Sequence, residues 1–435
     1  MESARHGIWR NEGRPQDSMS ISEQMAASAA VDEARLWQRM MDMAQFGATP
    51  AGGVNRAAFS REDIAARKRL IEWAGEFGFA TATDEIGNLY VRRAGTSDEA
   101  PAVTGSHLDS QPKGGKFDGA YGVVGGFEAL EAIERAGIET RRPIEVVAWS
   151  NEEGGRFQPG AMGSAIFAGD FLLEDALSTV DTNGLLLSDA LKETLESTPG
   201  IARRNMPYDM AGYIEAHIEQ GPRLENNNLT IGVVLGVQGL TWYRVDVVGE
   251  EAHAGTAPLQ GRKDALKSAT SMVAGLEQLM ADETDTVRFT VGRFECDPGA
   301  PSTVPGHVLF TVDFRHPDLA TFIDLGGRIK GVCEANARGC EVTVERIIYT
   351  EPVIFEPAVI DLVRGATEAL GLPNMEMVSG AGHDAMHIAG LCPAGMIFVP
   401  CENGLSHNEA ENASAADLAA GARVLAATLV GLANR

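Results

Sequence analysis

The chain has 435 residues, a formal net charge of -25 and a pI near 4.7. This acidic balance argues against nucleic acid and anionic membranes as partners, because both attract basic surfaces. Five cysteines without a C-x-x-C pair, a mean hydropathy of -0.09 and no apolar run as long as a membrane span predict a soluble protein of the reducing cytoplasm.

Residues 1–30 mix Arg, Glu, Gly, Pro, Ser and Ala and lack the apolar segment of a secretory signal, so they predict a flexible tail. Between residues 33 and 79, apolar side chains recur at helical spacing. Strand-like and helical stretches then alternate, and residues 144–149 form an apolar run typical of a strand buried on both faces of a sheet. The pattern predicts an α/β fold with a mixed sheet, in which sites form at the carboxyl ends of strands.

A second unit is predicted between residues 238 and 350. Its segments indicate, in order, a strand, a helix, two strands, a helix and a strand: 242–248, 263–280, 287–294, 307–314, 319–335 and 340–348. This βαββαβ order is typical of a ferredoxin-like sandwich. Because the unit contains none of the five candidate metal ligands described in the next paragraph, we interpret it as an inserted lid or dimerisation domain. The catalytic domain is then discontinuous, with residues 31–237 and 351–435.

Five residues in segments rich in glycine and carboxylates are candidate metal ligands: His107, Asp118, Glu153, His217 and His407. Three imidazoles and two carboxylates can hold two divalent ions if one carboxylate bridges them. The mixed nitrogen and oxygen set suits zinc, manganese, cobalt or nickel better than calcium or magnesium. Glu152 stands beside a ligand and is free to move protons, which predicts a metal-dependent hydrolase.

Each of these residues also has an ordinary structural interpretation. Adjacent glutamates such as Glu152 and Glu153 often form a solvated turn, and a histidine is often a satisfied core or surface residue. Here the glutamates follow a buried strand and precede two glycines, which favours a site. Asp109 lies two residues after His107, where its carboxylate can fix the imidazole tautomer as a supporting group around the metal.

Taken together, the motifs resemble those of the hydantoinase/carbamoylase family of amidases, which belongs with the aminoacylase-like dinuclear metallopeptidases. The resemblance extends from Phe46-Gly47 nearly to the end of the chain. Besides the ligand segments, it includes Asp84-Glu85-Ile86-Gly87-Asn88-Leu89, Glu215 to Pro222, His253-Ala254-Gly255-Thr256-Ala257-Pro258, Arg262-Lys263-Asp264-Ala265 and Ser379-Gly380-Ala381-Gly382-His383-Asp384-Ala385.

The resemblance implies roles for particular residues. One metal ion would be held by His107, Asp118 and His217, and the other by Asp118, Glu153 and His407. Glu152 would be the general base, and the peptide bond after Asp118 would be cis. The implied substrate contacts are Gln220, His253, Arg315 and His383, with His253 also placed in the catalytic set. The family further implies a homodimer formed through the lid, with His253 reaching the partner subunit's site.

One position departs from the family pattern. Members usually carry an asparagine thirteen residues before the arginine, where it helps the arginine bind a substrate carboxylate, but here Ser302 occupies that position relative to Arg315. Serine is shorter and offers one hydroxyl in place of an amide. Loss of a charge-assisted contact costs about 1–3 kcal/mol for a standard substrate. A larger substrate group or water must therefore fill the space.

We therefore predict an amidohydrolase that cleaves a linear amide or ureido bond of a small, carboxylate-bearing substrate, foremost an N-carbamoyl-L-amino acid. Allantoate or ureidoglycolate is an alternative substrate, and an aminoacylase or dipeptidase acting on an unusual N-acyl compound is another. A metal-binding protein with a degenerate site is a rival from a different class, although it would need no unligated Glu152. A dinucleotide-binding enzyme is disfavoured, because Gly122, Gly125 and Gly126 do not form a G-x-G-x-x-G motif.

Overall fold

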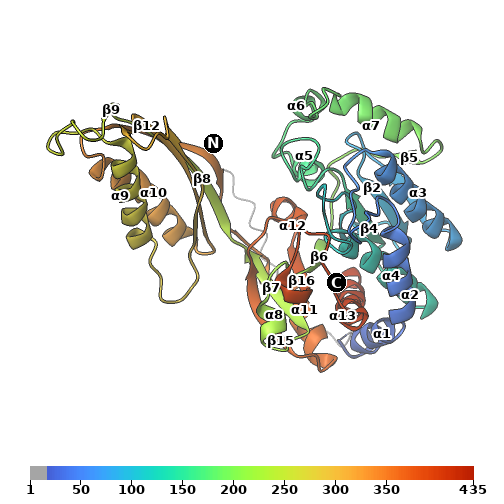
Figure 1. Cartoon of the computed structure of the whole chain (residues 1–435). Coiled ribbons are helices and arrows are strands. Elements are labelled where there is room, and N and C mark those ends of the chain that lie inside the picture. The colour runs from blue at the N-terminus through green and yellow to red at the C-terminus, as the bar shows by residue number, and fades with distance from the viewer. Residues whose placement is uncertain (1–16) are drawn as a thin grey trace, which may run out of the picture. The chain divides into compact units, whose positions relative to one another are not determined.

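The computed structural model describes residues 17–435 and divides into two compact units (Figure 1). Unit 1 comprises the described residues up to Val234 together with Phe355–Met377 and His383–Arg435. Unit 2 comprises Leu235–Ile354 and Val378–Gly382. The boundaries expected from the sequence, 237/238 and 350/351, differ from this division by a few residues. The short segment 378–382, which the sequence analysis includes in the catalytic domain, groups with unit 2 in this division.

The predicted flexible tail is only partly testable, because residues 1–16 lie outside the described residues. Residues Asp17–Ala29 form helix α1, so the prediction was wrong for this segment. α1 packs on the C-terminal helix α13 (Ala415–Ala433), and Ala27 and Ser28 are fully buried. The small side chains of this segment, which resemble a linker in composition, are what permit close approach to another helix.

Unit 1 is built on a large mixed sheet with the strand order β7-β16-β6-β3-β4-β2-β1-β5. The strands are β1 (Ala80–Thr83), β2 (Leu89–Arg93), β3 (Ala102–His107), β4 (Ile144–Trp149), β5 (Ala202–Arg203), β6 (Gly212–Ile218), β7 (Ile231–Val237) and β16 (Ala394–Val399), and β15 (Asn374–Ser379) pairs with β7. The central strands β16, β6, β3 and β4 run parallel. Every residue of these four strands is buried, as their apolar sequences require in a sheet that is covered on both faces.

The helices of unit 1 connect and cover these strands. They are α2 (Glu33–Met43), α3 (Arg61–Glu76), α4 (Ala120–Arg135), α5 (Met162–Ala168), α6 (Leu173–Leu177), α7 (Leu187–Glu196), α8 (Arg223–Asn226), α11 (Pro357–Ala369) and α12 (Asp384–Ile388), and a 3-10 turn spans Glu402–Gly404. α4 and α13 pack against each other and against the central strands. By length and composition α13 could cross a membrane, contrary to the expectation from the sequence, but 78% of its apolar window is buried inside the protein.

The parallel strands explain why distant residues meet. His107 ends β3, Glu152 and Glu153 follow β4, and His217 lies near the end of β6. His407 comes in the loop after β16. Because parallel strands end at the same edge of a sheet, these residues lie along one edge, where sites in open α/β sheets form.

Unit 2 contains β8 (Gly239–Val248), α9 (Ala265–Leu279), β10 (Arg288–Asp297), β12 (His307–His316), α10 (Leu319–Ala335) and β13 (Glu341–Thr350), which is the βαββαβ order that the sequence predicts. The strands form an antiparallel sheet of order β10-β12-β8-β13. Two short strands, β9 (Ala252–His253) and β11 (Thr303–Val304), pair with each other, and β14 (Val353–Ile354) pairs with β7.

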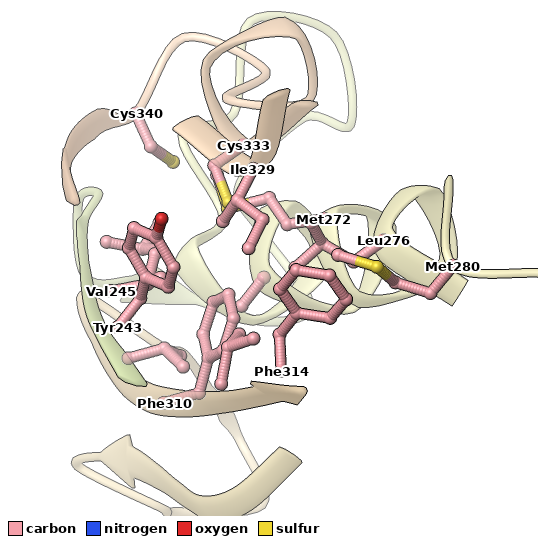
Figure 2. Packing of buried hydrophobic residues seen from close by; sticks show 14 of the residues in the cluster. Tyr243, Val245, Met272, Leu276, Met280, Phe310, Phe314, Ile329, Cys333 and Cys340 are labelled. Atoms are coloured by element: carbon pink, nitrogen blue, oxygen red, sulfur yellow. The ribbon is translucent and has the colours of Figure 1, made fainter. Parts of the chain in front are cut away.

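One face of the four-stranded sheet is covered by α9 and α10, which accounts for the alternating burial along β8. Figure 2 shows the resulting core, in which Phe310 and Phe314 of the sheet face Met272 of α9 and Ile329 of α10. Phe310 is fully buried, whereas Phe294 on the neighbouring strand is 40% exposed.

The Phe310→Ala substitution is expected to lower the free energy of unfolding of unit 2 by about 3–5 kcal/mol, because it leaves a cavity in a closed core. Urea unfolding followed by circular dichroism measures the change. The matched variant Phe294→Ala should lose less than half as much. Equal losses would contradict the core assignment.

Candidate metal centre

Asp118 lies at the centre of the predicted ligand set, immediately before α4. Its Oδ1 atom is 3.2 Å from Nε2 of His217 and 3.8 Å from Nε2 of His107. Its Oδ2 atom is 3.3 Å from Nε2 of His407. One carboxylate therefore faces imidazoles on two sides, which is the arrangement that a bridging ligand needs.

Glu153 completes the second side of this arrangement. Its Oε2 atom is 3.5 Å from Nε2 of His407. The ligand atoms form two groups, each with members within 4.8 Å of one another: His107, Asp118 and His217, and Asp118, Glu153 and His407. These are the same two sets that the family resemblance implies. Four of the five side chains are buried, whereas that of His407 is 51% exposed.

Backbone carbonyls orient two of the imidazoles. Nδ1 of His107 lies 2.9 Å from the carbonyl oxygen of Asp109, and Nδ1 of His217 lies 2.9 Å from that of Ile218. Because a carbonyl can only accept, each Nδ1 carries a hydrogen, which leaves each Nε2 as the ring atom that can bind a cation. Both Nε2 atoms face Asp118, and the backbone nitrogen of Gly119 lies 3.1 Å from Nε2 of His217.

The expected hydrogen bond between the Asp109 carboxylate and His107 is not formed, so this prediction was wrong. The nearer carboxylate oxygen is 3.9 Å from Nδ1, too far for a hydrogen bond. Instead the Asp109 oxygens accept the backbone N–H groups of Glu152 and Glu153, each at 3.2 Å. Buried backbone donors need acceptors, and Asp109 supplies them. It thereby holds the loop that carries both glutamates.

The loop that bends Asp118 into the site depends on Gly119. The N–H of Ala120 donates to the carbonyl of Asp118 at 2.6 Å, and Gly119 between them has φ 63° and ψ -50°, which is a γ-turn. A Cβ atom at Gly119 would lie 2.2 Å from the His107 ring, so only glycine fits. The prediction of a cis peptide bond after Asp118 was wrong. Among the described residues, the cis bonds are those that precede Pro159, Pro207 and Pro298.

Glu152 lies beside the two groups and belongs to neither. Its Oε2 atom is 3.4 Å from Nε2 of His107. Burial, followed by repulsion from Asp384 and Glu153, raises the pKa of Glu152 well above its usual range. A carboxyl group of this kind can hold and deliver a proton near neutral pH.

The charges around Asp118 are unbalanced. Among residues 17–435, no lysine or arginine forms an ion pair with Asp118, Glu152 or Glu153. Burial and the Asp118 charge raise the pKa of Glu153 to about 8. Hydrogen bonds to His217 and His407 outweigh the burial of Asp118 and hold its pKa well below the usual range.

The donor set fits divalent cations. Nε2 of His217 and Oδ1 of Asp118 are both electron-rich atoms, so at 3.2 Å they need a proton or a cation between them. Without a cation, the imidazoles of His217 and His407 have raised pKa values and so favour their protonated forms. The contact with Asp118 outweighs burial and raises the pKa of His217 to about 9, and it raises that of His407 to about 9 as well. Imidazole nitrogens mixed with carboxylate oxygens are typical ligands of zinc, manganese, cobalt and nickel.

Two of the predicted substrate contacts lie in unit 1 beside these groups. The side-chain amide of Gln220 donates to Oδ2 of Asp118 at 3.0 Å. The ring of His383 is buried and stands edge-on to that of His217, with centroids 4.6 Å apart. Burial holds the pKa of His383 well below its usual range, so this imidazole is neutral.

The other three predicted substrate contacts lie in unit 2. His253 on β9 and Ser302 beside β11 are neighbours, because the N–H of Ala254 donates to the carbonyl of Ser302 at 2.9 Å. Both side chains are exposed. Arg315 lies on β12, where Nε and Nη2 donate to the Asp313 carboxylate at 3.0 Å each and Nη1 donates to the carbonyl of Gly380 at 3.0 Å. A guanidinium has five N–H donors, so two remain for an anionic ligand.

Several residues that support the candidate ligands were not predicted from the sequence. Gln111 donates its backbone N–H to Oε1 of Glu153 at 3.2 Å and its side-chain amide to Oε2 at 2.9 Å. Glu215 accepts from the hydroxyl of Ser106 at 2.7 Å and from the N–H of Ala385 at 2.9 Å. Glu411 contacts the loop of Asp118. The only sequence signal for these residues was their closeness along the chain to ligand motifs.

Comparison with known proteins agrees with this chemistry. The model of peptidase family M20/M25/M40 matches residues 103–430. An N-carbamoyl-L-amino-acid amidohydrolase of Rhizobium meliloti is 40% identical, covering 91% of this chain and 95% of the relative. An allantoate amidohydrolase of Bacillus subtilis is 34% identical, with coverages of 90% and 95%.

Solved structures extend the likeness to the fold. A hydantoinase/carbamoylase family amidase from Burkholderia multivorans superimposes with a TM-score of 0.88 at 44% identity, covering 93% of this chain and 98% of that structure. The chain belongs to peptidase family M20/M25/M40 and, within it, to the hydantoinase/carbamoylase amidases. The prediction of an amidohydrolase is thereby confirmed.

The pKa shifts predict how metal removal changes stability with pH. In the metal-free protein the pKa values of Glu153, His217 and His407 are raised, so the folded state binds their protons more tightly than the unfolded state does. This stabilisation is complete below the ordinary pKa values and is lost as pH rises through about 8 to 9.

The melting temperature of chelator-treated protein should therefore fall between pH 6 and pH 9, while that of manganese-loaded protein changes less, because cations replace the protons. Differential scanning fluorimetry at each pH measures the gap between the two forms. A gap that stays constant or narrows toward pH 9 would contradict the site.

Proposed function

We propose that this amidohydrolase cleaves the ureido bond of an N-carbamoyl-L-amino acid at a centre of two divalent ions. The observation that carries the proposal is the Asp118 carboxylate shared between two ligand groups, with Glu152 beside them. Three relatives that are 36–40% identical over about nine tenths of the chain are N-carbamoyl-L-amino-acid amidohydrolases, which supports this substrate class.

His107, Asp118 and His217 would hold one ion, and Asp118, Glu153 and His407 the other. Zinc, manganese, cobalt or nickel would suit these ligands. When bound, such ions supply Lewis acidity, lowering the pKa of water and polarising a carbonyl group. The protein's part is to keep both Nε2 lone pairs directed at Asp118, through the Nδ1 contacts of His107 and His217.

Glu152 is the proposed general base. Its carboxylate accepts the proton of the attacking water, and the carboxylic acid that results delivers the proton to the leaving nitrogen. The raised pKa favours the proton-delivering half of this cycle, and bound cations would favour the ionised form that accepts the proton. Asp109 positions Glu152 by accepting its backbone N–H.

Unit 2 is proposed to supply substrate recognition and to act as a lid and a homodimerisation domain. Arg315 would pair with the substrate carboxylate through the two donors that Asp313 and Gly380 leave unused. His253 would donate to the developing oxyanion, and Ser302 would line the same subsite. Gln220 and His383 would contribute from unit 1. We place the enzyme in the cytoplasm, with a small-molecule substrate and neither nucleic acid nor membrane as partner.

Allantoate is the second candidate substrate. Allantoate amidohydrolases of Bacillus subtilis and Escherichia coli are 34% and 33% identical to this chain. Ser302, in place of the usual asparagine, leaves room for a bulkier group, which favours this alternative or an unusual N-acyl compound. Comparing kcat/KM across carbamoyl, acyl and ureido substrates separates the candidates.

The Glu152→Gln variant should lose activity by at least a hundredfold, because general acid–base catalysis contributes roughly 10²–10⁴-fold to rate. Its metal content should remain near that of the wild type, since Glu152 belongs to neither ligand group. Ammonia release and elemental analysis measure the two quantities. The exposed Glu193→Gln serves as a control, and full activity in the Glu152 variant would remove this residue from the mechanism.

The Arg315→Ala variant should raise KM about 10–100-fold for a carboxylate-bearing substrate, because a hydrogen bond to a charged group contributes about 1.5–3 kcal/mol. KM for the matching neutral amide should change little. Arg328→Ala, on the exposed side of α10, is the control within unit 2. Equal effects on charged and neutral substrates would show that Arg315 does not recognise the carboxylate.

A further inference from the structure

Glu411 is a buried carboxylate that connects two loops of unit 1. Its Oε1 atom accepts the backbone N–H of Phe117 at 2.9 Å and that of Asp118 at 3.1 Å. Glu411 itself follows His407 in the loop before α13. One oxygen atom thus ties the peptide that carries the bridging carboxylate to the loop that carries the most exposed ligand.

The second oxygen of Glu411 is linked to the Asp118 carboxylate through the hydroxyl of Ser406. The hydroxyl of Ser406 is 3.1 Å from Oε2 of Glu411 and 2.7 Å from Oδ2 of Asp118. A hydroxyl has a single hydrogen, so it donates to one of these carboxylates at a time. When Oδ2 of Asp118 binds a cation, the Ser406 hydroxyl can turn to Glu411 without losing its partner.

The sequence makes room for this carboxylate. A Cβ atom at Gly115 would lie 2.0 Å from the carboxyl carbon and from Oε1 of Glu411. Gly115 precedes Phe117 and Asp118 in the same loop. A larger residue there would push the Glu411 carboxylate away from the two N–H groups.

We propose that Glu411 is a positioning residue of the metal centre. It fixes the distance between Asp118 and His407, which together form most of the second ligand group. Glu411 belongs to neither ligand group and acts through the backbone of Asp118 and the hydroxyl of Ser406. This inference rests on the proposed two-ion centre.

The experiment titrates metal-free protein with Mn²⁺ in a calorimeter. Groups that support metal ligands typically contribute 10–100-fold to metal affinity, so Glu411→Ala should weaken at least one of the two binding events by that factor. Glu411→Gln should lose less, because its amide oxygen can still accept both N–H groups. Glu409→Ala is the matched control, since its carboxylate bonds to Thr49 and not to the Asp118 loop.

Gly115→Ala provides a second variant if Glu411→Ala fails to fold. It keeps the Glu411 side chain but displaces it, and it should weaken Mn²⁺ binding in the same way. Circular dichroism verifies the fold of each variant. Folded Glu411→Ala, or folded Gly115→Ala in its place, that binds two Mn²⁺ ions as tightly as wild type would overturn the positioning role. Wild-type protein that fails to bind two Mn²⁺ ions would instead overturn the two-ion centre itself.

Discussion

The arrangement of the candidate site depends on the contacts that the Asp118 carboxylate makes with three imidazoles. Its two oxygens face imidazoles that arrive from β3, β6 and the loop after β16. The parallel strands of the sheet bring these segments to one edge, and the γ-turn at Gly119 directs the carboxylate between them. The fold therefore brings several candidate ligands close to the Asp118 carboxylate.

Charge balance explains why this centre needs cations. Glu152 and Glu153 lie near Asp118 without a lysine or arginine partner among the residues that the structure describes, and burial raises the pKa of both carboxyl groups. Divalent ions would replace protons there and leave Glu152 as the group that can exchange one. The same crowding of acids that destabilises a metal-free site thus equips it for hydrolysis. Asp109, Gln111 and Glu411 hold the crowded loops in place through backbone N–H groups.

Much of this candidate site was predictable, because its chemistry depends on which residue types are present and on which residues they follow. Histidines and carboxylates beside glycines indicate the candidate ligands, and the apolar strand at residues 144–149 places Glu152 at a sheet edge. The missed features depend on orientation. Sequence spacing put the Asp109 carboxylate on His107, but two backbone donors compete for it. Glu411 was not distinguishable from a surface glutamate, because its two donors lie nearly three hundred positions earlier.

An anomalous diffraction map of manganese-loaded crystals would show directly whether two cations share the Asp118 carboxylate. Two peaks are expected, one on each side of this carboxylate, with Glu152 bound to neither. A single peak, or two peaks of which only one contacts Asp118, would contradict the proposed two-ion centre.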